Sequence, residues 1–110
     1  DLSPDDWRRS VPRFQAGNLE RNVAVVARLE AIAGAVGVGL PALALAWLLA
    51  QGDEVIPLVG SSRADHVERS LDALEVERTD DYLAAIDAAA PVGAAAGDRY
   101  PPSMMAGLGR

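Results

Sequence analysis

The sequence predicts an α/β fold that is part of a larger βα architecture and is mostly α if the chain is taken alone. The first observation is the order of the predicted elements: two helices, one strand and two helices. This order contains a single βα unit, preceded by helices that would return the chain from an earlier strand. The second observation is an almost wholly apolar helix at residues 40–51, which a chain of 110 residues can hardly bury.

The N-terminal 17 residues (DLSPDDWRRSVPRFQAG) are polar and punctuated by proline, and we expect a loop with one short helical turn around residues 6–10. From Asn18 onward, apolar residues recur at steps of three and four, which predicts an amphipathic helix. We expect Asn18 to cap this helix and Gly37 to end it. The apolar positions are Leu19, Val23, Val26, Leu29, Ala33 and Val36.

A second helix is predicted at residues 40–51, with Pro41 in its first turn and Gly52 at its end. It contains almost no polar residue, so we expect it to be buried nearly all round. Residues 54–59 (EVIPLV) are the only strong strand candidate. A lone strand leaves backbone groups unpaired on both edges, and Pro57 removes one donor. The strand therefore requires partners that the sequence does not contain.

Two further helices follow the predicted strand. Residues 64–74 form the first of them, with an apolar face made of Val67, Leu71 and Leu74. Thr79 is expected to cap the second, at residues 80–90, where two aspartates in the first turn suit the helix dipole. Residues 92–110 are rich in glycine, alanine and proline and are predicted to form an irregular tail.

The composition excludes several functional classes. The net charge of −6 argues against nucleic acid or an anionic membrane as a partner. The ten basic residues are all arginine, so no lysine is available for catalysis or a Schiff base. Without cysteine and with one histidine, the chain offers no disulfide and no recognisable metal site. No membrane-spanning run or signal-peptide pattern is present, and a cytoplasmic protein is expected.

The sharpest local feature is the predicted strand-to-helix junction VIPLVGSSRADH (55–66). Gly60 lets the backbone approach a ligand closely. The hydroxyls of Ser61 and Ser62 and the N–H groups of the helix start can donate to an anion. Arg63 adds a planar charged fork suited to phosphate. The same residues also fit a capped helix with a solvated arginine, and only the wider context decides between the two.

Other residues carry weaker expectations. His66 is expected to be a surface or packing residue, whereas Arg69 fits nucleotide contact and solvent exposure equally well. Trp47 is expected in the core and Tyr82 on a packed helix face. Residues 98–101 fit either a flap facing a ligand or a surface turn. No catalytic constellation emerges from the spacing of these residues.

Four segments nevertheless follow one another as in bacterial aldo-keto reductases, and the chain resembles this family over nearly its whole length. The segments are WRRSVPRFQ (7–15), ALAWLLAQG (44–52), VIPLVGSSR (55–63) and AAGDRYP (95–101). The family fold is a (β/α)8 TIM barrel, which needs roughly 250 residues. The resemblance therefore implies the C-terminal part of such a barrel: residues 1–91 supply its last helices and strand eight, and residues 92–110 the C-terminal tail.

The resemblance also implies a cofactor, NADP(H), whose adenosine 2′-phosphate is held by the loop after strand eight and by the following helix. The implied cofactor-binding residues are Gly60, Ser61, Ser62, Arg63, His66, Arg69 and Ser70. Close relatives usually have an acidic residue and asparagine at the positions of Arg69 and Ser70, and often a basic residue at Ser62. These departures leave Arg63 as the main phosphate candidate and leave the preference for NADP over NAD open.

The catalytic residues of the family are an aspartate, a tyrosine, a lysine and a histidine from earlier strands, with tyrosine as the general acid. None of these positions lies in this stretch, and Tyr82 and Tyr100 do not match the catalytic tyrosine. We therefore expect the 110 residues alone to be inactive. They would need the remainder of the barrel to reduce a small aldehyde or ketone. The alternative is a non-catalytic nucleotide-binding or helical interaction remnant.

Overall fold

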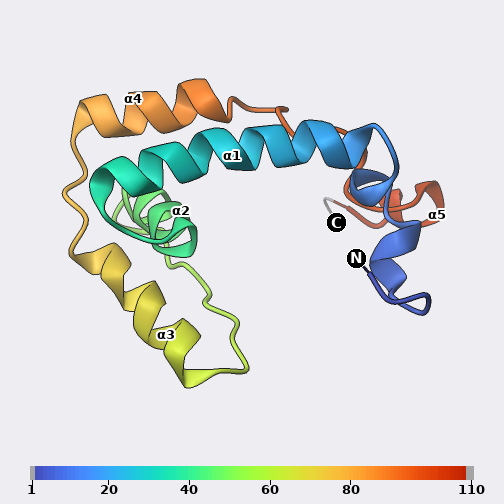
Figure 1. Cartoon of the computed structure of the whole chain (residues 1–110), viewed down its shortest axis with the longest axis horizontal. Coiled ribbons are helices and arrows are strands. Elements are labelled where there is room, and N and C mark those ends of the chain that lie inside the picture. Colours follow the sequence, from blue (N-terminus) through green and yellow to red (C-terminus); the bar gives the residue numbers. More distant parts are fainter. Residues whose placement is uncertain (1, 109–110) are drawn as a thin grey trace.

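The computed structural model describes residues 2–108, and over this range the chain forms helices, turns and irregular segments without a β-strand (Figure 1). The longest helix, α1, has α4 packed along it, and α2 leaves its C-terminal end at an angle of 85°. The helix α3 lies beyond α2, and the whole has the shape of an arch (Figure 1). The elements are the 3-10 turns η1 (Trp7–Ser10), η2 (Pro12–Phe14) and η3 (Asp72–Leu74), and the helices α1 (Asn18–Val36), α2 (Leu40–Leu49), α3 (Ala64–Leu71), α4 (Asp80–Ala89) and α5 (Pro102–Met105).

The start of α1 differs by one residue from the prediction. The cap is Gly17, at a φ of +84°, and the Glu20 carboxylate accepts a hydrogen bond of 2.5 Å from its N–H. Asn18 is already helical, and its side chain donates to the Pro12 carbonyl instead (2.9 Å). The prediction that Asn18 caps the helix is therefore wrong, because its side chain is bonded to the Pro12 carbonyl and not to a free N–H of the first turn. The predicted end at Gly37 is confirmed, in the left-handed conformation.

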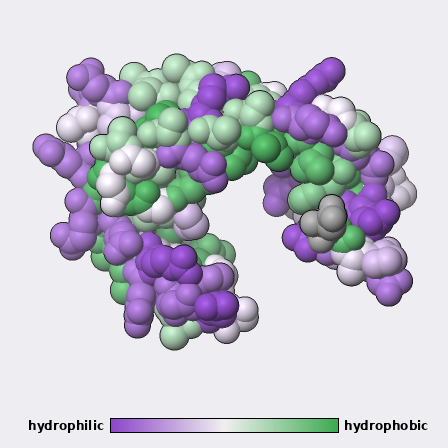
Figure 2. Space-filling view, in the orientation of Figure 1, coloured by the Kyte–Doolittle hydropathy of each residue, from purple (hydrophilic) through white to green (hydrophobic). Residues whose placement is uncertain are grey.

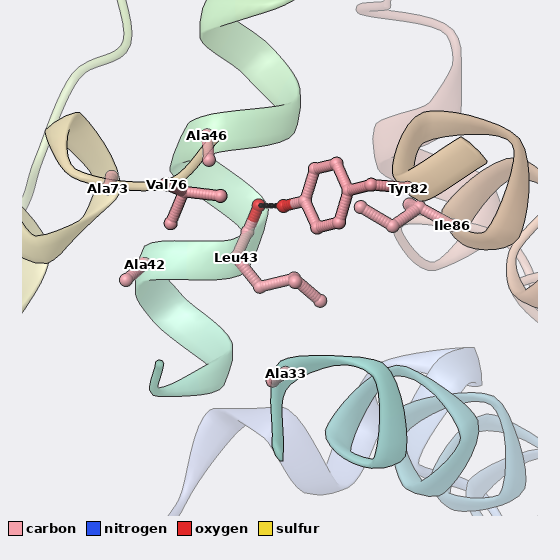
Figure 3. Close-up of a cluster of buried hydrophobic side chains, with 8 residues drawn as sticks. All are labelled: Ala33, Ala42, Leu43, Ala46, Ala73, Val76, Tyr82 and Ile86. Atoms are coloured by element: carbon pink, nitrogen blue, oxygen red, sulfur yellow. Dashed lines mark hydrogen bonds between the residues drawn. The ribbon is translucent and has the colours of Figure 1, made fainter. Parts of the chain in front are cut away.

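The core lies where α1, α2, η3 and α4 meet (Figure 3). Its buried members are Ala33, Ala42, Leu43, Ala46, Ala73, Val76, Tyr82 and Ile86. The Tyr82 ring enters this cluster and its hydroxyl donates to the Leu43 carbonyl (3.3 Å). The polar end of the ring is thus satisfied while its apolar body is buried, as buried tyrosines require. Tyr82 is a packing residue, as predicted.

The apolar helix α2 is covered on one side only. Three of its residues are buried, whereas Ala44 and Leu48 are exposed, so the prediction of burial all round is wrong for the described structure. The helix also ends at Leu49 rather than at residue 51. Trp47 is half-buried, not a core residue, and its indole Nε1 donates to Asp87 Oδ1 of α4 (2.9 Å). Ala44 and Leu48 line an apolar pocket of about 340 Å³, whose other walls include Leu29 of α1 and Ile86 of α4.

The predicted strand at residues 54–59 is not formed. This segment is irregular, and Ile56 and Leu58 are 82% and 94% exposed. A strand exists only as part of a ladder, and the described chain offers no second strand to pair with it. The helix after it forms as predicted but becomes a 3-10 turn after Leu71. Figure 2 shows hydrophilic surface over α3 and hydrophobic surface over the middle of α1.

Side-chain hydrogen bonds satisfy backbone groups at both ends of α4. At its start, Thr79 Oγ1 accepts a hydrogen bond from the Tyr82 N–H (3.3 Å), which confirms the predicted cap. At its end, Arg28 of α1 donates to the Ala89 carbonyl through Nε (3.2 Å) and Nη2 (2.9 Å). A cation at a helix C-terminus satisfies carbonyls that lack a helical partner and complements the dipole.

The segment after α4 is tied back to α1. Asn22 Nδ2 donates to the Ala96 carbonyl (3.0 Å) and its Oδ1 accepts from the Ala96 N–H (2.7 Å). Gly97 follows at a φ of +84°, and a Cβ there would lie 2.9 Å from the Pro12 carbonyl carbon and oxygen. Two of the family-like segments, 7–15 and 95–101, are thereby in contact.

The tail is more regular than predicted. Residues 102–105 form the short helix α5, with Pro102 in its first turn, a position where a missing N–H costs nothing. The prediction of a wholly irregular tail is wrong at this point. Residues 109–110 of the predicted tail lie outside the described residues.

No single helix in the described part of the chain is long and apolar enough to cross a membrane; α1 and α2 reach that length and hydropathy only as a pair bent by 85°.

Candidate functional site

The start of α3 and the loop before it line a pocket of about 270 Å³. Five of the seven residues predicted to bind the cofactor lie in its wall. The lining residues are Gly39, Pro41, Gly60, Ser61, His66, Arg69, Ser70 and Asp72. The first two come from the start of α2, so α2 and α3 face each other across the pocket. Ser62 and Arg63 lie outside this wall, and both are exposed.

Two hydroxyls of the predicted site already make internal hydrogen bonds. Ser61 Oγ donates to the Arg63 carbonyl (2.9 Å) and accepts from the Arg63 N–H (3.1 Å). Ser70 Oγ donates to the His66 carbonyl one turn earlier (2.8 Å). Short polar side chains commonly bond to nearby backbone in this way. Ser61 thus shapes the turn into α3, and an anion at this hydroxyl must replace one of these bonds.

The two arginines of the predicted site meet at one carboxylate, that of Asp65. Arg63 donates through Nε to Oδ1 (2.9 Å) and through Nη2 to Oδ2 (3.1 Å). Arg69 donates through Nη2 to Oδ2 (2.7 Å) and through Nε to the Asp65 carbonyl (3.1 Å). His66 Nε2 lies 3.9 Å from the same Oδ2. Hydrogen bonds from Arg63, and then from Arg69, hold the pKa of the Asp65 carboxyl below its ordinary value.

The sequence reasoning gave no role to Asp65. The signal was present in the spacing, since Asp65 is two residues after Arg63 and four residues before Arg69. Side chains four apart on a helix are neighbours, and an acidic residue four positions before a basic one forms a favourable pair. All three side chains are about half exposed or more, and of the three only Arg69 lines the pocket, so the Arg63–Asp65–Arg69 cluster lies at the surface beside the pocket.

The tyrosines have other surroundings. Burial raises the pKa of the Tyr82 hydroxyl, which is bonded within the core. The Arg99 guanidinium carbon lies over the Tyr100 ring, 5.5 Å from the centroid of that ring, in cation–π geometry.

Between residues 2 and 108 there is no group of three or more acidic, histidine or cysteine side chains that could hold a metal ion. The candidate site itself contains the Arg63 and Arg69 guanidiniums, which can hold an anion, and the His66 imidazole in the pocket wall.

With this geometry in place, comparison with known proteins identifies the family. The model of the Aldo/keto reductase family matches residues 1–91. The chain belongs to this family. The fold of this family is a TIM barrel.

Similar proteins come from two fungi and a plant. The aldo-keto reductase yakc of Schizosaccharomyces pombe, whose name specifies NADP(+), is 38% identical over 102 residues. A probable aldo-keto reductase 1 of Glycine max is 38% identical over 89 residues, and the aldo-keto reductase str7 of Strobilurus tenacellus is 33% identical over 99. A bacterial source, as the resemblance suggested, stays a prediction.

These matches cover most of this chain and a minor part of each relative. They include 93%, 81% and 90% of the chain but only 30%, 26% and 30% of the respective relative. The chain therefore spans less than a third of the length of these reductases. No solved structure matches it.

Proposed function

We propose that this chain is the C-terminal part of an NADP(H)-dependent aldo-keto reductase that reduces aldehydes or ketones to alcohols. In this proposal it supplies strand eight, the last helices and the side of the cofactor site that holds the adenosine 2′-phosphate. The observation that carries the proposal is the pocket at the start of α3, where five residues of the implied cofactor site come together in a chain of this family.

The chemistry of the Arg63–Asp65–Arg69 cluster supports an anionic ligand. Arg63 and Arg69 are permanently charged forks at the start and in the second turn of α3, and phosphate is the anion that such forks bind with two parallel hydrogen bonds. The start of α3 adds the positive end of a helix dipole. Gly60 leaves the approach to the helix open, since nothing lies within 4 Å of where a Cβ would be.

Exposed apolar side chains support the need for the remainder of a barrel. Ile56 and Leu58 in the unpaired segment are largely exposed, and so are Leu71 and Leu74 beyond it, at 57% and 62%. In a barrel, the segment would gain strand neighbours and the helices would cover these side chains. The length of the relatives fits this requirement. When bound, the nicotinamide would supply the hydride, while the residues of this chain would hold the adenosine end in place.

The test uses the full-length protein that carries this sequence. The in-frame coding sequence before Asp1 is expected to encode the tyrosine and lysine of the family active site. The purified full-length protein should oxidise NADPH in the presence of simple aldehydes or ketones, which is followed at 340 nm. A full-length protein without that tyrosine and lysine, and without NADPH oxidation, would instead favour a non-catalytic binding remnant.

A further inference from the structure

Asp65 occupies one hydrogen-bonding edge of each of the two arginines through which a phosphate could bind. The Nε and Nη2 groups of Arg63 form one edge of the guanidinium, and both donate to the Asp65 carboxylate. The same edge of Arg69 donates to the Asp65 carbonyl and carboxylate. A phosphate that binds either arginine through this edge must displace Asp65, and one that binds through the other edge shares the guanidinium with it.

The Asp65 carboxylate also lowers the net positive charge of the Arg63–Asp65–Arg69 cluster. Arg63 and Arg69 contribute two positive charges, and Asp65, whose carboxyl stays ionised at neutral pH, removes one of them. A 2′-phosphate carries nearly two negative charges at neutral pH, so it meets less attraction than the arginines alone would give it. The adenosine 2′-hydroxyl of NAD(H) is neutral and loses nothing by this arrangement.

The exposure of the cluster sets the size of the effect. The side chains of Arg63, Asp65 and Arg69 are 64%, 46% and 63% exposed, so their ion pairs are weak and screened by salt. A phosphate can therefore displace the carboxylate, and Asp65 lowers the affinity for the phosphate without closing the site. Asp65 therefore affects the difference in affinity between NADP(H) and NAD(H), which differ only in the 2′-phosphate.

We propose that Asp65 is a specificity-determining residue that narrows the preference of this site for NADP(H) over NAD(H). The proposal rests on the proposed function, because it concerns the same cofactor site. It predicts a reductase that accepts both nicotinamide cofactors with a modest ratio between them, and it assigns that ratio to a competition between Asp65 and the 2′-phosphate for Arg63 and Arg69.

The experiment compares Asp65→Asn with Asp65→Ser and with the matched control Glu68→Gln in the full-length protein. Glu68 lies on the same helix, and no ion pair joins it to Arg63 or Arg69 among the described residues. Dissociation constants for NADPH and NADH are measured by nucleotide fluorescence. Those for 2′,5′-ADP and 5′-AMP, which differ by the 2′-phosphate alone, are measured by calorimetry.

Both Asp65 variants are expected to bind NADPH and 2′,5′-ADP about three- to tenfold more tightly at low salt, as expected when one charge is removed close to a phosphate. Binding of NADH and 5′-AMP should change by less than about twofold, and the gain should shrink as the salt concentration rises. Glu68→Gln should leave the ratio of the two affinities nearly unchanged. Circular dichroism checks that each variant is folded, and the serine variant serves if the asparagine variant does not fold.

The outcomes separate this inference from the proposed function. A wild-type protein that binds neither NADPH nor NADH would overturn the proposed function and the role of Asp65 with it. A wild-type protein that binds NADPH, with Asp65 variants that leave the ratio unchanged or weaken the binding of 2′,5′-ADP, would overturn only the role of Asp65. Equal gains from Glu68→Gln would also overturn it, because the effect would then be one of net charge.

Discussion

Leu43 and Leu58 are leucines in apolar stretches fifteen residues apart, yet Leu43 is 1% exposed and Leu58 is 94% exposed. Leu43 belongs to a helix whose hydrogen bonds are internal, and three neighbouring elements pack on it. Leu58 belongs to a segment that needs a strand on either side, and the described chain offers none. The comparison shows that one region is organised by contacts within the described chain, whereas the region leading to the candidate site has few such contacts. Under the proposed function, the rest of the barrel would supply them.

The strongest test of this difference is the behaviour of the 110-residue chain by itself. We expect a helical circular dichroism spectrum but a broad thermal transition, because the apolar surface around α2 and residues 54–59 lacks its neighbours. The full-length protein should unfold in a sharp transition. Calorimetry on both proteins checks this. A cooperative two-state transition of the 110-residue chain as a monomer would remove the basis of the comparison.

Truncation of either leucine to alanine in the full-length protein should reduce the free energy of unfolding by a similar amount. Leu43→Ala is expected to reduce the free energy of unfolding by about 2–5 kcal/mol, the usual cost of a cavity in a core. Leu58→Ala should have a similar cost there, because the proposed strand eight would be buried on both faces. Val92→Ala, at a fully exposed position, is the control and should change the free energy by less than about 0.5 kcal/mol. Urea unfolding measures all three, and an effect of Leu58→Ala as small as that of the control would count against the barrel.

Gly97→Ala should destabilise the packed region at a point where backbone approaches backbone. Its φ of +84° strains an L-residue, and a Cβ would meet the Pro12 backbone at 2.9 Å. We expect a loss of about 1–3 kcal/mol in the free energy of unfolding, similar to other overpacked sites. Gly93→Ala is the matched control, since Gly93 has a φ of +83° with nothing within 4 Å of its Cβ position. Equal losses from both substitutions would assign the effect to φ alone and not to the contact.

The cap of α4 has a smaller expected effect. Thr79→Ala removes the acceptor for the Tyr82 N–H and should cost about 1 kcal/mol, whereas Thr79→Ser should retain most of the stability. The measurement is again urea unfolding of the full-length protein. A serine variant as unstable as the alanine variant would indicate that the methyl group, and not the hydroxyl, matters at this position.

The smallest expected effect concerns the free energy of unfolding at acidic pH. Hydrogen bonds from the Arg8 side chain and backbone lower the pKa of Asp6 from 3.8 to about 2. A carboxyl whose pKa is lower in the folded state stabilises it above pH 4, and this contribution is lost as the pH falls towards 2. The difference in unfolding free energy between the wild type and Asp6→Asn should therefore fade between pH 4 and 2. Asp5→Asn is the control, and a difference for Asp6→Asn that is constant over this range would contradict the assignment.

The features that the sequence predicted well are those decided by neighbours along the chain. The end of α1 at Gly37 and the cap of α4 at Thr79 depend on a few consecutive residues, and both are confirmed. The strand at residues 54–59 and the burial of α2 on all sides depend on distant partners, and neither is present in the described structure. The helix cap at Gly17 was missed because glycine has no side chain to mark it, whereas Asn18 has a side chain of the type that usually caps helices.

The candidate site divides in the same way. Gly60, Ser61 and the pocket-facing residues of α3 are brought together because the turn and the helix are local structures. Asp65 was missed although its spacing from Arg63 and Arg69 is a known pairing, because the arginines were weighed as partners of a ligand or of solvent and not of a carboxylate on the same helix. The roles of the seven cofactor residues remain predictions.

Because Asn22 binds Ala96 through two hydrogen bonds, Gly97 is a suitable position at which to exchange the C-terminal tail. One side-chain amide satisfies both main-chain groups of Ala96, and Gly97 lies against Pro12, so the chain is positioned before the last segment begins. The position of the backbone before residues 98–108 is therefore set by Asn22 and Pro12, and not by the sequence of the tail. We expect tails grafted from other reductases at Gly97 to keep the helices intact, which makes this position a practical starting point for recombining chains of the family.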